Sequence, residues 1–119
     1  MSAAPWPVEI KLDKPKTKLT VVYDNGDRFT LDAEYLRVES PSAEVQGHAA
    51  AQKQTIGGKK DVKIAALEPV GNYAVRIIFD DGHDTGLYSW DWLHELGRDH
   101  GKKWAAYIKA LGEKGLDRA

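Results

Sequence analysis

The first residues to consider for chemistry are the histidines, because only their side chains titrate near neutrality without a perturbed pKa. His83 and His94 lie within a dozen residues of Asp84, Ser89 and Glu95, a set that contains a base, a hydroxyl and carboxylates. The stretch has no strained Gly-x-Ser-x-Gly turn and no glycine-rich oxyanion loop, and Ser89 is already explained as a helix N-cap. A hydrolase is the third of three hypotheses, and we expect no catalytic residue and no enzyme activity.

The same histidines could bind a metal ion, since neutral imidazole is a common ligand. No two of them stand four residues apart, as in a helical zinc pair; they are His48, His83, His94 and His100. The chain has no cysteine, which excludes thiolate zinc ligands, disulfides and cysteine-bound iron–sulfur clusters. We expect no cofactor, and a metal- or small-ligand-binding role using His83 and His48 remains the alternative function.

An aromatic cluster follows His83 and consists of Tyr88, Trp90, Trp92 and Trp104. A small fold needs such large side chains in its core. The helix expected at residues 89–97 is apolar on more than one face. We therefore expect Trp90 or Trp92 to remain at the surface as part of a protein-docking patch.

Six short strands are expected to position these residues. Alternating apolar and polar residues, bounded by turn residues, predict strands at 8–12, 19–23, 29–31, 62–67, 73–79 and 86–88. Asn25-Gly26 predicts a hairpin between the second and third strands, and a turn is expected at residues 69–72.

Helices are expected mainly near the end of the chain. Ser89 caps a helix that ends at Gly97, and a second helix at 99–111 places Trp104, Ile108 and Leu111 on its apolar face, with Gly112 available to end it. A short helix led by Asp32 is expected at 32–38. Strands followed by helices predict the α+β class: a single domain with a mainly antiparallel sheet of about six short strands and two C-terminal helices packed against it.

The domain is expected to span residues 6–112, with a disordered start at 1–5 and a flexible end at 113–119. Residues 40–61 are rich in small polar residues and show neither the helical nor the strand periodicity of apolar residues. This composition predicts a long mobile loop, which is a place to look for binding.

Charge and hydropathy exclude several partners. The formal net charge is -1, so no global basic field attracts nucleic acid. No apolar run approaches the length of a membrane span, and the first residues do not form a signal peptide. We expect a cytoplasmic protein that binds neither nucleic acid nor membrane; the oligomeric state stays open.

A resemblance to a known family lies in residues 36–48, in residues 71–93 and in the "HELG" that follows. The sequence resembles the gamma-butyrobetaine hydroxylase-like N-terminal domain family, in its small stand-alone bacterial form. The match covers residues 6–97, and Gly82–Trp90, "GHDTGLYSW", carries its most specific motif. The resemblance implies an α+β fold. In large hydroxylases, a domain of this family precedes an iron- and 2-oxoglutarate-dependent catalytic domain. In other proteins of the family, the domain is fused to ATPases that carry iron–sulfur clusters.

The resemblance also implies a structural zinc held by three cysteines and one histidine. The histidine matches His83, whereas the cysteines would fall close to Ser40, Ser42 and Val45. The family's zinc site is therefore degenerate here, and His83 is left as a structural histidine that bonds the nearby loop.

The resulting hypothesis is a small non-enzymatic accessory or protein-interaction module, linked by family resemblance to iron–sulfur or hydroxylase systems. Its binding residues would be His83, Tyr88, Trp90, Trp92 and His48, with an unidentified protein as the partner.

Overall fold

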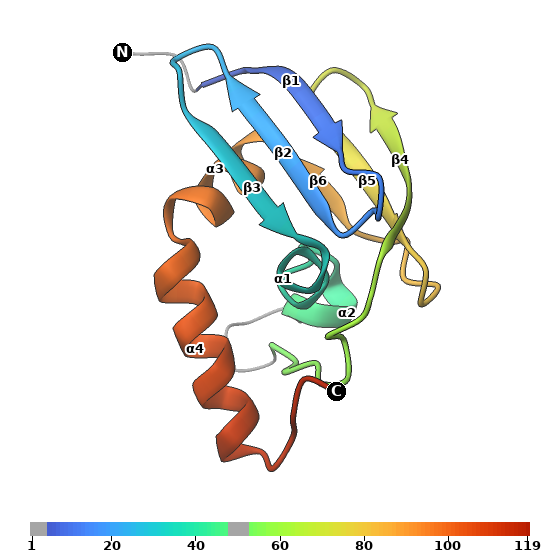
Figure 1. Cartoon of the computed structure of the whole chain (residues 1–119), viewed down its shortest axis with the longest axis vertical. Coiled ribbons are helices and arrows are strands. Elements are labelled where there is room, and N and C mark those ends of the chain that lie inside the picture. The colour runs from blue at the N-terminus through green and yellow to red at the C-terminus, as the bar shows by residue number, and fades with distance from the viewer. Residues whose placement is uncertain (1–4, 48–52) are drawn as a thin grey trace.

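The Asn25-Gly26 turn builds the first of two antiparallel sheets in the computed structural model, which describes residues 5–47 and 53–119 (Figure 1). Gly26 has a φ of 93°, a left-handed conformation that glycine adopts without a Cβ clash. The sheet has the order β1-β2-β3 and consists of β1 (Pro7–Leu12), β2 (Lys18–Tyr23) and β3 (Arg28–Asp32). The predicted hairpin is thus confirmed.

The second sheet has the order β4-β5-β6 and consists of β4 (Ile64–Val70), β5 (Ala74–Phe79) and β6 (Leu87–Ser89). The turn expected at 69–72 begins later, because Pro69 lies inside β4. β4 is an edge strand, where proline's missing N–H breaks no ladder on the open side.

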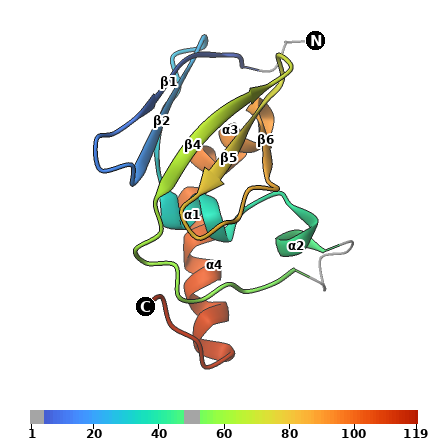
Figure 2. The same cartoon turned by 90° about the vertical axis from the view of Figure 1, so that its right-hand side faces the viewer.

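The α+β class and the six strands are confirmed, but the strands form two sheets instead of one. The two sheets face each other as a wedge, with α1 (Ala33–Val38) at its base (Figure 2). An apolar core fills the space between the sheets and includes Leu19 and Leu31 from the first sheet and Ile77 and Tyr88 from the second. A smaller cluster of Val38, Tyr107 and Leu111 lies beside α4. The inner faces of the two sheets are buried against each other, whereas we expected one sheet with a single face covered by helices.

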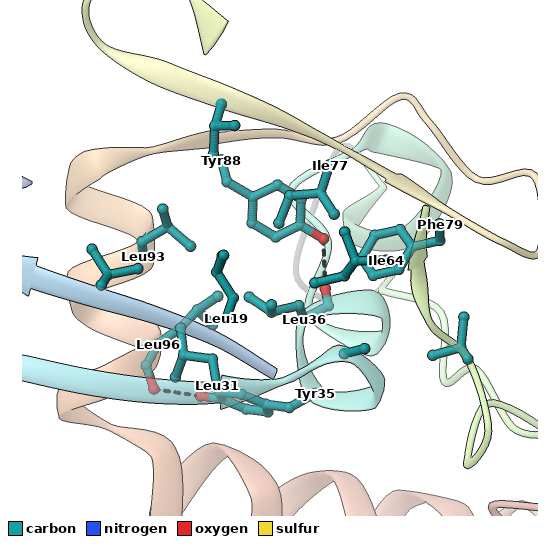
Figure 3. Close-up of a cluster of buried hydrophobic side chains, with 14 of the residues drawn as sticks. Leu19, Leu31, Tyr35, Leu36, Ile64, Ile77, Phe79, Tyr88, Leu93 and Leu96 are labelled. Carbon is teal, nitrogen blue, oxygen red and sulfur yellow. Dashed lines mark hydrogen bonds between the residues drawn. The ribbon is translucent and has the colours of Figure 1, made fainter. Parts of the chain in front are cut away.

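Three buried tyrosines fix the helices to this core, and Figure 3 shows two of them, Tyr35 and Tyr88. Each hydroxyl donates to a backbone carbonyl distant in sequence: Tyr35 to Leu96 (2.7 Å), Tyr23 to Trp90 (2.9 Å), and Tyr88 to Leu36. These bonds satisfy the polar end of each ring, so the fold buries large side chains without leaving an unpaired hydroxyl.

Two further helices follow β6. α3 (Trp90–Arg98) begins at Ser89, whose Oγ accepts the Trp92 N–H at 3.1 Å, so the predicted N-cap is confirmed. α4 (His100–Glu113) extends through Gly112, which does not end it. Its packed face differs from the expected one: Tyr107 is buried, whereas Ile108 is 41% exposed.

Residues 40–61 contain a short helix, α2 (Ala43–Gln46), that the sequence analysis missed. Ser42 is its N-cap, because its Oγ accepts the Glu44 N–H at 3.2 Å. At the start of α1, Asp32 occupies the expected N-cap position, but its side chain forms no capping bond.

The C-terminal segment returns to the body of the protein, although we expected 113–119 to be flexible. Arg118 forms a bidentate pair with Glu34, and the carbonyl of Asp117 accepts the Gly58 N–H at 3.0 Å. Within the ranges that the structure describes, no helix has the length and apolar character to cross a bilayer.

Gly97 gives the first test, because it lies inside α3 and does not end the helix. A Cβ at this position would overlap the Phe29 ring close to its attachment point, so Gly97→Ala should destabilise the fold by about 1–3 kcal/mol. Gly112→Ala, in open space on α4, should be neutral or stabilising by about 0.5–1 kcal/mol. Urea denaturation measures both changes. Equal stability of the two variants would contradict the packing role of Gly97.

Candidate functional site

His83 lies in a buried polar cluster next to the turn that follows β5. A backbone bond from the Phe79 N–H to the His83 carbonyl (3.0 Å) closes the turn, and Gly82 has a φ of 89°. The imidazole Nε2 lies 2.9 Å from Ser40 Oγ, and Nδ1 lies 3.3 Å from Glu44 Oε2. Only 3% of the side chain is exposed, so His83 joins the turn to the segment that holds α2.

Ser42 and Thr85 form a second link between the same two segments. Their hydroxyl oxygens lie 2.8 Å apart, and the Ser42 N–H donates to Ser40 Oγ at 3.3 Å. Since Ser42 also caps α2, the hydroxyl groups fix both the start of this helix and its distance from the β5–β6 connection.

Asp81 supplies the charge that holds the cluster together. It accepts the His83 N–H at 3.0 Å and pairs with Arg37 Nε at 2.8 Å and Lys59 Nζ at 2.6 Å. Burial alone would raise the pKa of Asp81, but the bonds from Lys59, the His83 N–H and Arg37 outweigh it and lower the pKa to about 2. The carboxylate is therefore ionised throughout the neutral range.

The structural zinc implied by the family resemblance does not fit these residues. Ser40 and Ser42 do lie beside His83, as the resemblance indicates. However, the Ser40 hydroxyl bonds the imidazole and the Ser42 N–H, and the Ser42 hydroxyl bonds Thr85 and the Glu44 N–H. Val45 is buried and offers no donor. No group of three or more histidine, cysteine or carboxylate side chains in the described parts of the chain could hold a metal ion. His48 lies outside the described residues.

Ser40, His83 and Glu44 repeat the contact order of a hydrolase triad, with the hydroxyl on one imidazole nitrogen and a carboxylate on the other. However, Ser40 is completely buried and lines none of the described pockets. A nucleophile must reach a substrate, so the arrangement here fits structural bracing. Ser89, the serine considered from the sequence, is committed to its N-cap.

The aromatic residues are more deeply packed than the predicted docking patch requires. Tyr88 is fully buried, whereas Trp90 and Trp92 are half-buried. The Trp90 indole N–H donates to the Asn72 carbonyl at 2.9 Å, and the Trp92 indole N–H donates to the Glu39 carbonyl at 3.1 Å. Both tryptophans therefore use their polar ends inside the fold.

The largest described concavity lies elsewhere, between α4 and residues 53–55. This groove has a volume of about 460 Å³. It is lined by Val38, Glu39, Lys53, Gln54, Thr55, Asp99, Lys102, Lys103, Ala106, Tyr107, Ala110 and Lys114. Its floor is apolar and its rim is rich in lysine.

Some of the charges around the groove are already paired within the protein. Lys53 Nζ binds both carboxylate oxygens of Glu39 at 2.8 Å, and Lys103 Nζ lies 3.1 Å from Glu95 and 5.0 Å from the centre of the Trp92 ring. The ammonium groups of Lys102 and Lys114 form no ion pair within the described ranges. No local sequence pattern indicates this site, because residues 53–55 and the start of α4 are about fifty residues apart in the chain.

His83 gives a prediction about pH. Burial, and then the charge of Arg37, hold the pKa of His83 below its ordinary value. The unfolded chain therefore takes up a proton first as the pH falls through about 6.5, so the neutral histidine's stabilising contribution is complete above that pH and decreases below it. We expect the free energy of unfolding in urea to fall between about pH 7.5 and 5.5, and His83→Gln to lack this part of the fall. A wild-type minus variant difference that is constant with pH would contradict this.

Comparisons with known proteins agree with the fold. Two solution NMR structures each have a TM-score of 0.84. The first is 43% identical, and the match covers 98% of this chain and 91% of that one. The second is 45% identical, and the match covers 99% of this chain and 88% of that one. A crystal structure from Acidithiobacillus ferrooxidans, described as a protein of unknown function in the DUF971 family, is 35% identical, with a TM-score of 0.64 over 76% of this chain and 91% of that one. A search of curated proteins gave no match.

Residues 10–94 match the model of the family described as gamma-butyrobetaine hydroxylase-like, N-terminal. This range includes the end of β1, all the other strands, α1, α2 and the His83 cluster. The matched range covers more than half of the chain, and it agrees with the structural similarity over nearly the whole length. The chain belongs to the gamma-butyrobetaine hydroxylase-like N-terminal family.

Proposed function

We propose that this protein is a small, cytoplasmic, non-enzymatic accessory module that binds a partner protein through the groove between α4 and residues 53–55. The observation that carries the proposal is the groove itself, which combines an apolar floor with a rim of lysines. Concave sites of this size with a few convergent polar groups are the usual places for specific binding.

The chemistry of the groove supports binding more than catalysis. Its described lining contains no histidine and no serine, so it lacks the usual pairing of a base with a hydroxyl nucleophile. The one tyrosine, Tyr107, donates its hydroxyl to the Ile56 carbonyl at 2.6 Å, and burial raises its pKa to about 12. Tyr107 is therefore a neutral structural side chain at physiological pH.

The His83 cluster has a supporting role in this proposal. It fixes α2, and the Val45 carbonyl of α2 accepts the Gln54 N–H at 2.6 Å, which holds the wall of the groove. The link to iron–sulfur or hydroxylase systems enters the proposal only by analogy with the family.

A pair of alanines on α4 tests the proposal. Ala106 and Ala105 are both exposed, but only Ala106 lines the groove. Ala106→Glu should place a charge in the groove and remove specifically captured proteins in affinity capture from lysate, whereas Ala105→Glu should retain them. Circular dichroism should show both variants folded, since both changes lie at the helix surface.

Equal capture by the wild type and both variants would overturn the groove as the binding surface. Loss of capture in both variants to the same extent would also overturn it, because the effect would then not depend on the groove-lining position.

A further inference from the structure

The groove combines two kinds of recognition along one face of α4. Lys103, Tyr107, Ala110 and Lys114 follow one another at helical spacings of three and four residues, so they share a face. The small side chains of Ala106 and Ala110 leave room for a ligand between the lysines, and Val38 of α1 completes the apolar floor.

The charge of the groove opposes that of the whole protein. Four lysines line it against two carboxylates, those of Glu39 and Asp99, which leaves a local excess of two positive charges in a chain of net charge -1. Glu39 is 3% exposed and is neutralised by Lys53, and Asp99 pairs with Arg98. The groove therefore presents cations, and a negatively charged ligand complements it.

The spacing of the cations indicates the size of that ligand. Lys102 and Lys103 lie at one end of the helix face and Lys114 lies three turns further, which is about 16–18 Å along a helix axis. An extended peptide of about five residues covers that length, whereas a single small carboxylate or phosphate reaches only one end. The apolar floor lies between the two charged ends, where the middle of such a peptide would sit.

We propose that the groove binds an extended acidic segment of a partner protein, with acidic residues at both ends of about five residues and an apolar side chain between them. This inference rests on the proposed function and names the chemistry of its partner. The acidic ends pair with Lys102 and Lys114, and the apolar side chain lies on Ala106 and Tyr107. The complex should weaken as salt rises, because rim ion pairs are screened.

The probe is a fluorescein-labelled synthetic peptide, Asp-Asp-Ser-Leu-Ser-Asp-Asp, titrated with the full chain by fluorescence anisotropy at low salt. Two control peptides replace Leu by Ser or all Asp by Lys. The double variant Lys102→Gln, Lys114→Gln should bind the acidic peptide at least about fivefold more weakly. The matched control Lys109→Gln, an exposed α4 position outside the groove, should stay within about twofold of the wild type.

Three results together support the proposal. The acidic peptide binds the wild type and the Lys109→Gln variant, it does not bind the Lys102→Gln, Lys114→Gln double variant, and it binds more weakly when its Leu is replaced by Ser. Equal binding of the basic peptide, equal binding by all the variants, or full competition by inorganic phosphate or a short single-stranded oligonucleotide overturns it. If no peptide binds while Ala106→Glu still removes the captured proteins, the acidic-segment inference fails and the proposed function stands. If Ala106→Glu also has no effect on capture, both fail.

Discussion

The positions of α1, α2 and the β5–β6 connection relative to one another depend on the buried contact between His83 and Ser40. This contact, with the Asp81–Arg37 ion pair beside it, ties the β5–β6 connection to α1 and α2. One backbone bond connects α2 to the groove, because the Val45 carbonyl accepts the N–H of Gln54, which lies in the groove wall. Burial and the charge of Arg37 lower the pKa of His83, so the imidazole is neutral at neutral pH and has one nitrogen that donates a bond and one that accepts.

Side-chain bonds also hold the part of the protein around α4. Tyr107 joins α4 to Ile56, and the bidentate pair of Arg118 with Glu34 fastens the C-terminal segment to α1. The groove thus lies between two walls: a backbone bond of Gln54 holds one to α2, and the Tyr107 hydroxyl joins the other, α4, to Ile56. A rigid groove loses little conformational entropy when a ligand binds, which suits a recognition role.

Much of the fold could be predicted from local signals. The alternating pattern gave the strands, Asn25-Gly26 gave the hairpin, and Ser89 gave the start of α3. α2 was missed although Ser42 with Glu44 two residues later is a helix-start signal, because the many small residues around it dominated the pattern. The role of Gly97 could not be predicted, since only the folded structure places Phe29 against it. The groove could not be predicted either, because Lys102 and Lys103 alone have the pattern of a solvated helix face.

The proposed contact with another protein lies on the face of α4 that contains Ala106. The most direct measurement is photo-crosslinking in cells from a benzophenone amino acid placed at position 106, compared with the same group at position 105. We expect a discrete crosslinked partner from position 106 and none from position 105. Crosslinks of equal yield and identity from both positions, or from neither, would contradict it.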